Sequence, residues 1–141
     1  MKAGFTVVET IIVLGIVAII VMFSVPGVSQ SCAYHKEQLF WSELRQNWRA
    51  AQLRARDERQ VTQIEYEQDG NQIIFTAGSK QDVVHLPGTI QVIRFEPFQM
   101  HENGYVKPQT QEFKSSLTGR HYLMRIQLAW GGYHVESVNE K

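Results

Sequence analysis

The sequence predicts an α+β fold, in which a long amino-terminal helix packs its outer half against an antiparallel β-sheet. Three observations lead to this prediction: an apolar run fills residues 5–25, helical periodicity follows over 31–59, and the period of the pattern changes to two from Val61 onward. The 141 residues leave room for one modest domain after the apolar segment.

The apolar segment carries a single charge, because Glu9 is the only ionisable residue from Phe5 to Val25. As a helix the segment is roughly 32 Å long, which matches a hydrocarbon core of about 30 Å. An ionised, unpaired carboxylate inside such a core costs about 2.5–3.5 kcal/mol. Glu9 therefore needs a cation. Cleavage after Gly4 would place a new amine on Phe5, one helical turn before Glu9. In staggered parallel helices, the Phe5 amine of one subunit would lie beside Glu9 of the next.

These residues resemble the class III signal of type IV pilins and pseudopilins: a short leader with Lys2 that ends at Gly4, then Phe5, Thr6 and Glu9 before an Ile/Val/Leu run. The resemblance implies cleavage by prepilin peptidase between Gly4 and Phe5, methylation of the new amine on Phe5, and a role for Glu9 in filament assembly. It also implies a single-pass membrane protein with a cytoplasmic amino terminus and an extracellular domain, which reaches the cell surface in a pilus after assembly.

The predicted organisation has three parts. Residues 1–4 form the leader, 5–27 the transmembrane or filament-core helix, and 28–141 an extracellular domain with an amphipathic helix over 31–59 and an antiparallel sheet over 61–138. Pro26 and Gly27 are expected to bend or locally melt the helix, and Pro26 stands where pilin helices commonly carry a proline.

Two other interpretations of the amino terminus remain beside this one. An ordinary secretory or lipoprotein signal fits less well, because Glu9 interrupts the apolar run, the run is long, and the residues before Cys32 lack a convincing lipobox. A plain single-pass anchor is the stronger alternative.

The second helical segment has an apolar stripe that is expected to face the sheet. Phe40, Leu44, Trp48, Ala51 and Ala55 form the stripe, and Trp41 widens it.

Arginines occupy other positions of the same segment. Arginines in such positions usually form a solvent-exposed helix face. The chain has 14 basic and 14 acidic residues, so its net charge does not favour binding to nucleic acid. Direct contact with DNA remains a hypothesis, for which a steep loss of binding with added salt would be the sign. Its first candidates are Arg45, Arg49, Arg54, Arg56 and Arg59.

Strands follow with turns at Asp69–Asn71, Gly78–Lys80 and Gly131–Gly132. Residues 97–119 lack clean periodicity and are expected to form a loop with one short strand at 111–114. The other predicted strands are 61–67, 72–76, 82–86, 89–95, 120–130 and 133–138.

No pattern in the chain indicates catalysis, a cofactor or a metal. The five histidines lack metal-ligand spacing, and a calcium loop rich in Asp is missing. The single cysteine, Cys32, excludes an intrachain disulfide, and we expect an unreactive buried thiol rather than a bridge to another subunit. The histidines are His35, His85, His101, His121 and His134.

Within the pilin family, the short leader, compact domain and missing carboxyl-terminal disulfide loop resemble a minor pilin of the competence pilus of Gram-positive bacteria. This resemblance implies a structural role in filament initiation and in DNA uptake during transformation. The implied partners are other major and minor pilins, prepilin peptidase, the membrane, and DNA through the assembled pilus. The alternatives are a minor pseudopilin of type II secretion, or a bitopic membrane protein with a small β-rich binding domain.

Overall fold

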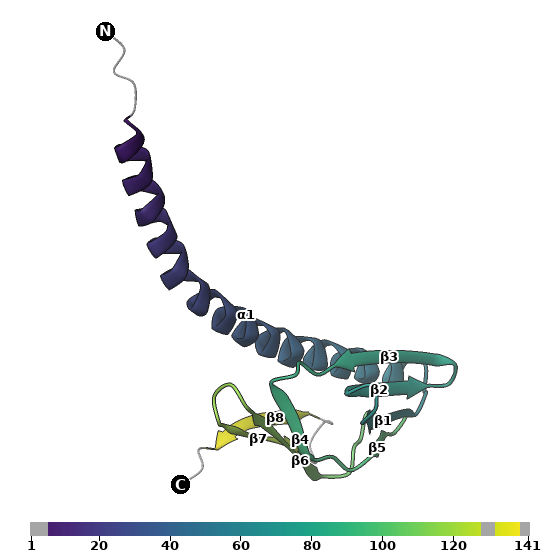
Figure 1. Cartoon of the computed structure of the whole chain (residues 1–141). Helices are drawn as coiled ribbons and strands as arrows, with labels where there is room; N and C mark the ends of the chain where they lie inside the picture. Colours follow the sequence, from purple (N-terminus) through teal and green to yellow (C-terminus); the bar gives the residue numbers. More distant parts are fainter. Residues whose placement is uncertain (1–5, 128–131, 139–141) are drawn as a thin grey trace.

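A computed structural model of the chain describes residues 6–127 and 132–138, and the side chains of 24–29 lie outside this description. One long helix, α1 (Val7–Asp57), precedes eight strands. In Figure 1 the amino-terminal part of α1 projects away from the strands, and its carboxyl-terminal part lies along them. The predicted α+β class is confirmed.

The strands form two four-stranded antiparallel sheets, where the sequence predicted one. Sheet A has the order β3-β2-β1-β5, and sheet B the order β4-β6-β7-β8. The division arises because β4 leaves its sequence neighbour β3 and pairs with β6, while β5 returns to β1. Sheet A contains β1 (Thr62–Glu67), β2 (Gln72–Ala77), β3 (Lys80–His85) and β5 (Phe98–Met100); sheet B contains β4 (Ile90–Arg94), β6 (Gln109–Ser115), β7 (His121–Ile126) and β8 (Tyr133–Val138).

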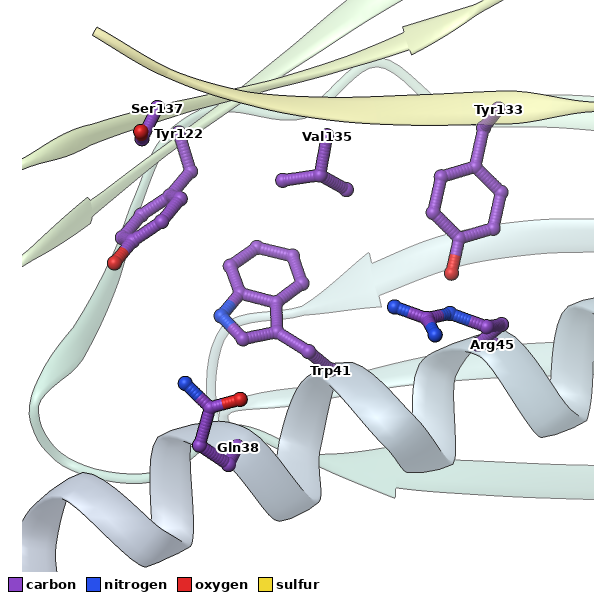
Figure 2. Close-up of a pocket in the computed structure, with 7 residues that line it drawn as sticks. All are labelled: Gln38, Trp41, Arg45, Tyr122, Tyr133, Val135 and Ser137. Atoms are coloured by element: carbon purple, nitrogen blue, oxygen red, sulfur yellow. The ribbon is translucent and has the colours of Figure 1, made fainter.

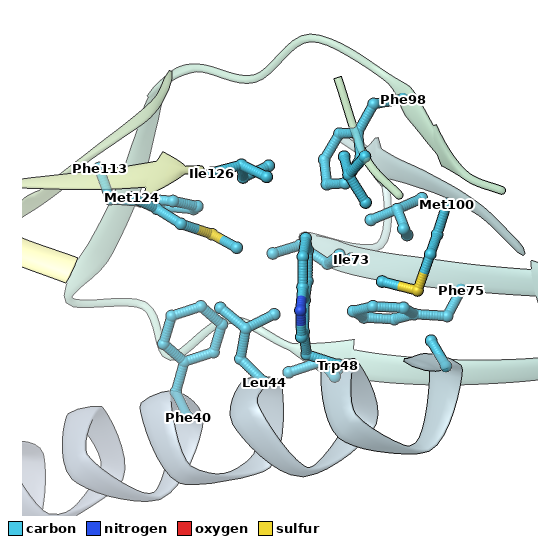
Figure 3. Close-up of a cluster of buried hydrophobic side chains, with 14 of the residues drawn as sticks. Phe40, Leu44, Trp48, Ile73, Phe75, Phe98, Met100, Phe113, Met124 and Ile126 are labelled. Carbon is cyan, nitrogen blue, oxygen red and sulfur yellow. The ribbon is translucent and has the colours of Figure 1, made fainter. Parts of the chain in front are cut away.

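The core lies between the apolar stripe of α1 and both sheets (Figure 3). All five stripe residues, Phe40 to Ala55, are buried as predicted, and Trp41 is partly buried against the core. The Trp48 ring lies 5.8 Å from Phe98 of sheet A and 4.9 Å from Tyr133 of sheet B, between ring centroids. One face of the helix thus holds the two sheets together.

Helix α1 is assigned without interruption through positions 26 and 27, so the predicted division into segments 5–27 and 31–59 does not appear as two helices. Figure 1 shows that the ribbon curves along its length. The expected kink at Pro26 and Gly27 falls on residues whose side chains lie outside the description, and it stays a prediction.

The range 97–119 is more ordered than its sequence indicated. It contains the short strand β5 and a β6 that extends beyond the predicted 111–114. Gly104, at φ +78°, makes the turn between them in a conformation that side-chain-bearing residues rarely adopt. The last predicted strand, 120–130, is described as β7 up to Ile126, and its end at 128–130 and Gly131 of the turn lie outside the described residues.

Candidate assembly surface

Residues 7–23 of α1 are mostly apolar and are exposed. Their large apolar side chains from Val7 to Phe23 are all about half exposed or more, from 49% at Val13 to 81% at Phe23. A helix that is apolar all round is normally buried in protein or lipid. No other element of the described chain covers this surface.

Glu9 lies in the first turn of that surface. The Thr6 side chain caps the helix by accepting a hydrogen bond from the Glu9 backbone N–H, at 3.3 Å. A carboxylate in the first turn also interacts favourably with the positive end of the helix dipole. Glu9 is exposed, and no cation of the described residues pairs with its carboxylate. Gly4 and Phe5, the predicted cleavage and methylation residues, lie outside the described range.

Between residues 6 and 127, and from 132 to 138, no helical stretch combines the length and apolarity that a membrane crossing requires.

The five candidate arginines do not form one surface. At 100° per residue, Arg54 lies on the side of α1 opposite to Arg45. There its side chain, 13% exposed, pairs with Asp82 of β3. Arg56 approaches Gly104, and Arg59 follows the end of the helix at φ +50°. Arg45 and Arg49 share a groove.

Replacement of Asp82 by asparagine is expected to lower the free energy of unfolding by about 1 kcal/mol, because Arg54 is mostly buried and loses its anion while Asp82 itself is 41% exposed. Urea unfolding of the full chain in detergent micelles, followed by near-ultraviolet circular dichroism, measures the loss. Glu58→Gln is the matched control, since its 3.8 Å pair with Lys80 is exposed and should contribute less than about 0.5 kcal/mol. Equal effects of the two changes would contradict a special role for the Arg54 pair.

A groove runs between α1 and β8 and consists of two adjoining pockets of about 240 and 360 Å³. Figure 2 shows Trp41 and Arg45 of α1 facing Tyr133 and Val135 of β8 across the first pocket. Arg49 lines the second pocket, which shares Arg45, Tyr133 and Val135 with the first.

Tyr133 links the two walls of this groove. Burial raises the pKa of its hydroxyl above the ordinary value of 10.0, while a hydrogen bond from Arg45 and the charges of Arg45 and Arg49 act in the opposite direction. The hydroxyl is therefore neutral at physiological pH.

Cys32 is exposed on α1, so the prediction of a buried thiol was wrong. The buried face of α1 begins only at Glu37, beyond the turn that carries Cys32. His121 is partly buried in β7 and His85 is exposed on β3, and no cluster of three metal-ligating side chains occurs in the part of the chain described here.

Sequence reasoning missed a buried carboxylate. Glu37, only 2% exposed, accepts a hydrogen bond of 2.7 Å from the Ser115 hydroxyl at the end of β6. Its burial could have been predicted from the sequence, because position 37 precedes Phe40 and Leu44 at helical intervals and so lies on the same buried face. The pair joins α1 to sheet B.

Comparisons of the chain with family models, with curated proteins and with solved structures gave no match.

Proposed function

We propose that this chain is a minor subunit of a type IV pilus-like filament, structural rather than catalytic. One observation carries the proposal: residues 7–23 of α1 are mostly apolar and exposed, and they bear a single acid, Glu9, in the first turn of the helix. We infer that the fold corresponds to that of a pilin, in which one half of a long helix is free and the other half packs on a β-rich domain.

The exposed surface supplies the driving force for assembly. Burying one large aliphatic side chain contributes about 1.5–3 kcal/mol, and the range 7–23 offers many of them. Before assembly we place residues 5–27, a range that includes positions outside the description at both ends, in the cell membrane, with the amino terminus in the cytoplasm and the domain outside. In the filament, helices of other pilins take the place of lipid.

Glu9 fixes the axial offset between neighbouring subunits in that assembly. A carboxylate among packed apolar helices is stable where a cation lies against it. The amine of Phe5 in a neighbouring subunit, exposed by prepilin peptidase after Gly4 and then methylated, is that cation. Apolar contact alone would allow many axial offsets, whereas this pair selects one.

The competence pilus is the specific filament that we propose, on the resemblance of the short leader, the compact domain and the missing carboxyl-terminal disulfide loop described above. In that setting the subunit helps to initiate the filament, and DNA reaches the cell through the assembled pilus during transformation. The filament role does not require this subunit to touch DNA.

Intact-mass analysis of the chain from its native membrane tests the proposal. The expected mass lacks Met1–Gly4 and gains one methyl group on the new terminus at Phe5. Gly4→Val, which adds bulk beside the cleaved bond, is expected to accumulate the uncleaved chain, whereas Ala3→Val in the same leader serves as the matched control. Recovery of the unaltered protein with Met1 retained would rule out prepilin processing.

A further inference from the structure

Strand β8 is an open edge of sheet B, because β7 is its single neighbour among the described strands. The Gln127 N–H donates to the Gly132 carbonyl at 3.0 Å, and the register pairs Arg125 with His134. In an antiparallel ladder, even-numbered residues of β8 therefore point their backbone groups toward β7. The N–H and C=O groups of Tyr133, Val135 and Ser137 point away from it, and no hydrogen bond within the described chain engages them.

The other sheet edges are shorter, distorted or covered. Strand β3 lies against α1: its Asp82 pairs with Arg54 of the helix, and its Lys80 pairs with Glu58, which caps the helix. Strand β5 has three residues, and the pairing of β4 shifts register between Val92 and Arg94. Strand β8 has six residues and an unbroken register with β7. Proteins usually protect such an edge with a bulge, a proline or a cover, because it is a template for another strand.

The groove between β8 and α1 gives this edge a chemical preference. Arg45 and Arg49 stand one helical turn apart on the opposite wall, and none of the described residues that line the two pockets is a carboxylate. Neither arginine forms an ion pair within the described residues. Two guanidinium groups that line an open groove match two carboxylates of a ligand.

We propose that an extended acidic segment of another protein binds here, adding a strand to sheet B beside β8 and placing acidic side chains against Arg45 and Arg49. The alternating N–H and C=O groups of the edge select a polypeptide. A DNA backbone offers phosphate acceptors to the N–H groups and to the arginines, but no matching donors for the carbonyls of Tyr133, Val135 and Ser137. The inference is independent of the filament role.

The test uses the full chain in detergent micelles and a fluorescent, end-capped heptapeptide that alternates Asp with Thr. Fluorescence anisotropy is expected to show saturable binding, at least tenfold tighter than for the same peptide with Asn in place of Asp. Two further peptides carry N-methyl groups on either the Asp or the Thr amides. Because only alternate amides of an added strand face β8, one methylated peptide should lose binding and the other should keep it.

Protein variants locate the site. The double change Arg45→Gln, Arg49→Gln is expected to weaken binding of the Asp peptide at least tenfold. Arg56→Gln, on the same helix but outside the groove, should change it less than twofold. Ser137→Pro should also weaken binding, because the N–H that it removes points away from β7. If Ser137→Pro unfolds the domain, the two methylated peptides still decide the question.

Several outcomes would overturn the proposal. Equal binding of the Asp and Asn peptides would remove the role of the arginines, and equal effects of the two methylated peptides would remove the added strand. A single-stranded oligodeoxynucleotide that occupies the groove more tightly than the Asp peptide, with a steep salt dependence, would assign it to nucleic acid. Self-association abolished by Ser137→Pro would assign the edge to a second copy of this chain.

Discussion

Replacing Glu9 with leucine is expected to abolish incorporation of the chain into filaments while leaving membrane insertion and cleavage intact. Leucine removes the only charge from the apolar half of α1, and with it a cost of about 2.5–3.5 kcal/mol in lipid. Insertion should therefore be as good as before or better. Incorporation should fail, because nothing then pairs with the amine of the neighbouring subunit or fixes the axial offset.

Fractionation of sheared filaments from membranes, with the chain detected in each fraction, measures this result. Thr10→Ala is the matched control, because it alters the adjacent residue of the exposed helix and leaves the carboxylate in place. The mature mass of the Glu9→Leu chain checks that cleavage has occurred. Normal incorporation of the cleaved Glu9→Leu chain would mean that the carboxylate has no role in assembly.

Replacing Phe40 with alanine is expected to lower the free energy of unfolding by about 3–5 kcal/mol. Phe40 is 2% exposed, and its ring contacts those of Trp41, at 4.8 Å, and Phe113, at 6.3 Å between centroids. The truncation leaves a cavity where α1 meets sheet B. Since a domain of this size is stable by about 5–15 kcal/mol, the change removes a large fraction of its stability.

Leu39→Ala provides a control on the neighbouring residue. Leu39 is 66% exposed, so its truncation should change the unfolding free energy by less than about 0.5 kcal/mol. Urea unfolding of both full-length variants in the same micelles, followed by near-ultraviolet circular dichroism, gives the comparison. Similar losses for Phe40→Ala and Leu39→Ala would contradict the packing described for α1.

The parts of the fold that depend on local pattern were predictable from the sequence. The period of the stripe on α1 identified its buried residues from Phe40 to Ala55, and short turns identified the hairpins β1–β2 and β7–β8. Non-local pairing was not predictable. Contacts between residues distant in the chain decide whether β4 pairs with β3 or with β6. Strand β5 has only three residues after Pro97, which is too short for a recognisable alternation of apolar and polar residues.

The candidate sites divide in the same way. Glu9 is visible in the sequence because a charge interrupts an apolar run, whereas the groove exists only once β8 lies beside α1. The sequence placed Arg45 and Arg54 in one set, but the contact with Asp82 separates them. The burial of Glu37 was overlooked for a different reason: its position in the stripe was readable, but a carboxylate is seldom found in a core.

The position of Trp48 between Phe98 and Tyr133 has a mechanical consequence. No strand pairing joins sheet A to sheet B in the described chain, so tension along α1 reaches sheet A through the backbone of residues 58–61 and through side chains, and it is not shared with sheet B through a hydrogen-bonded ladder. Under tension along α1, we expect sheet A and sheet B to move relative to the helix independently of each other. Because the Trp48 ring contacts both Phe98 and Tyr133, its contacts would have to break for sheet A or sheet B to separate from the helix.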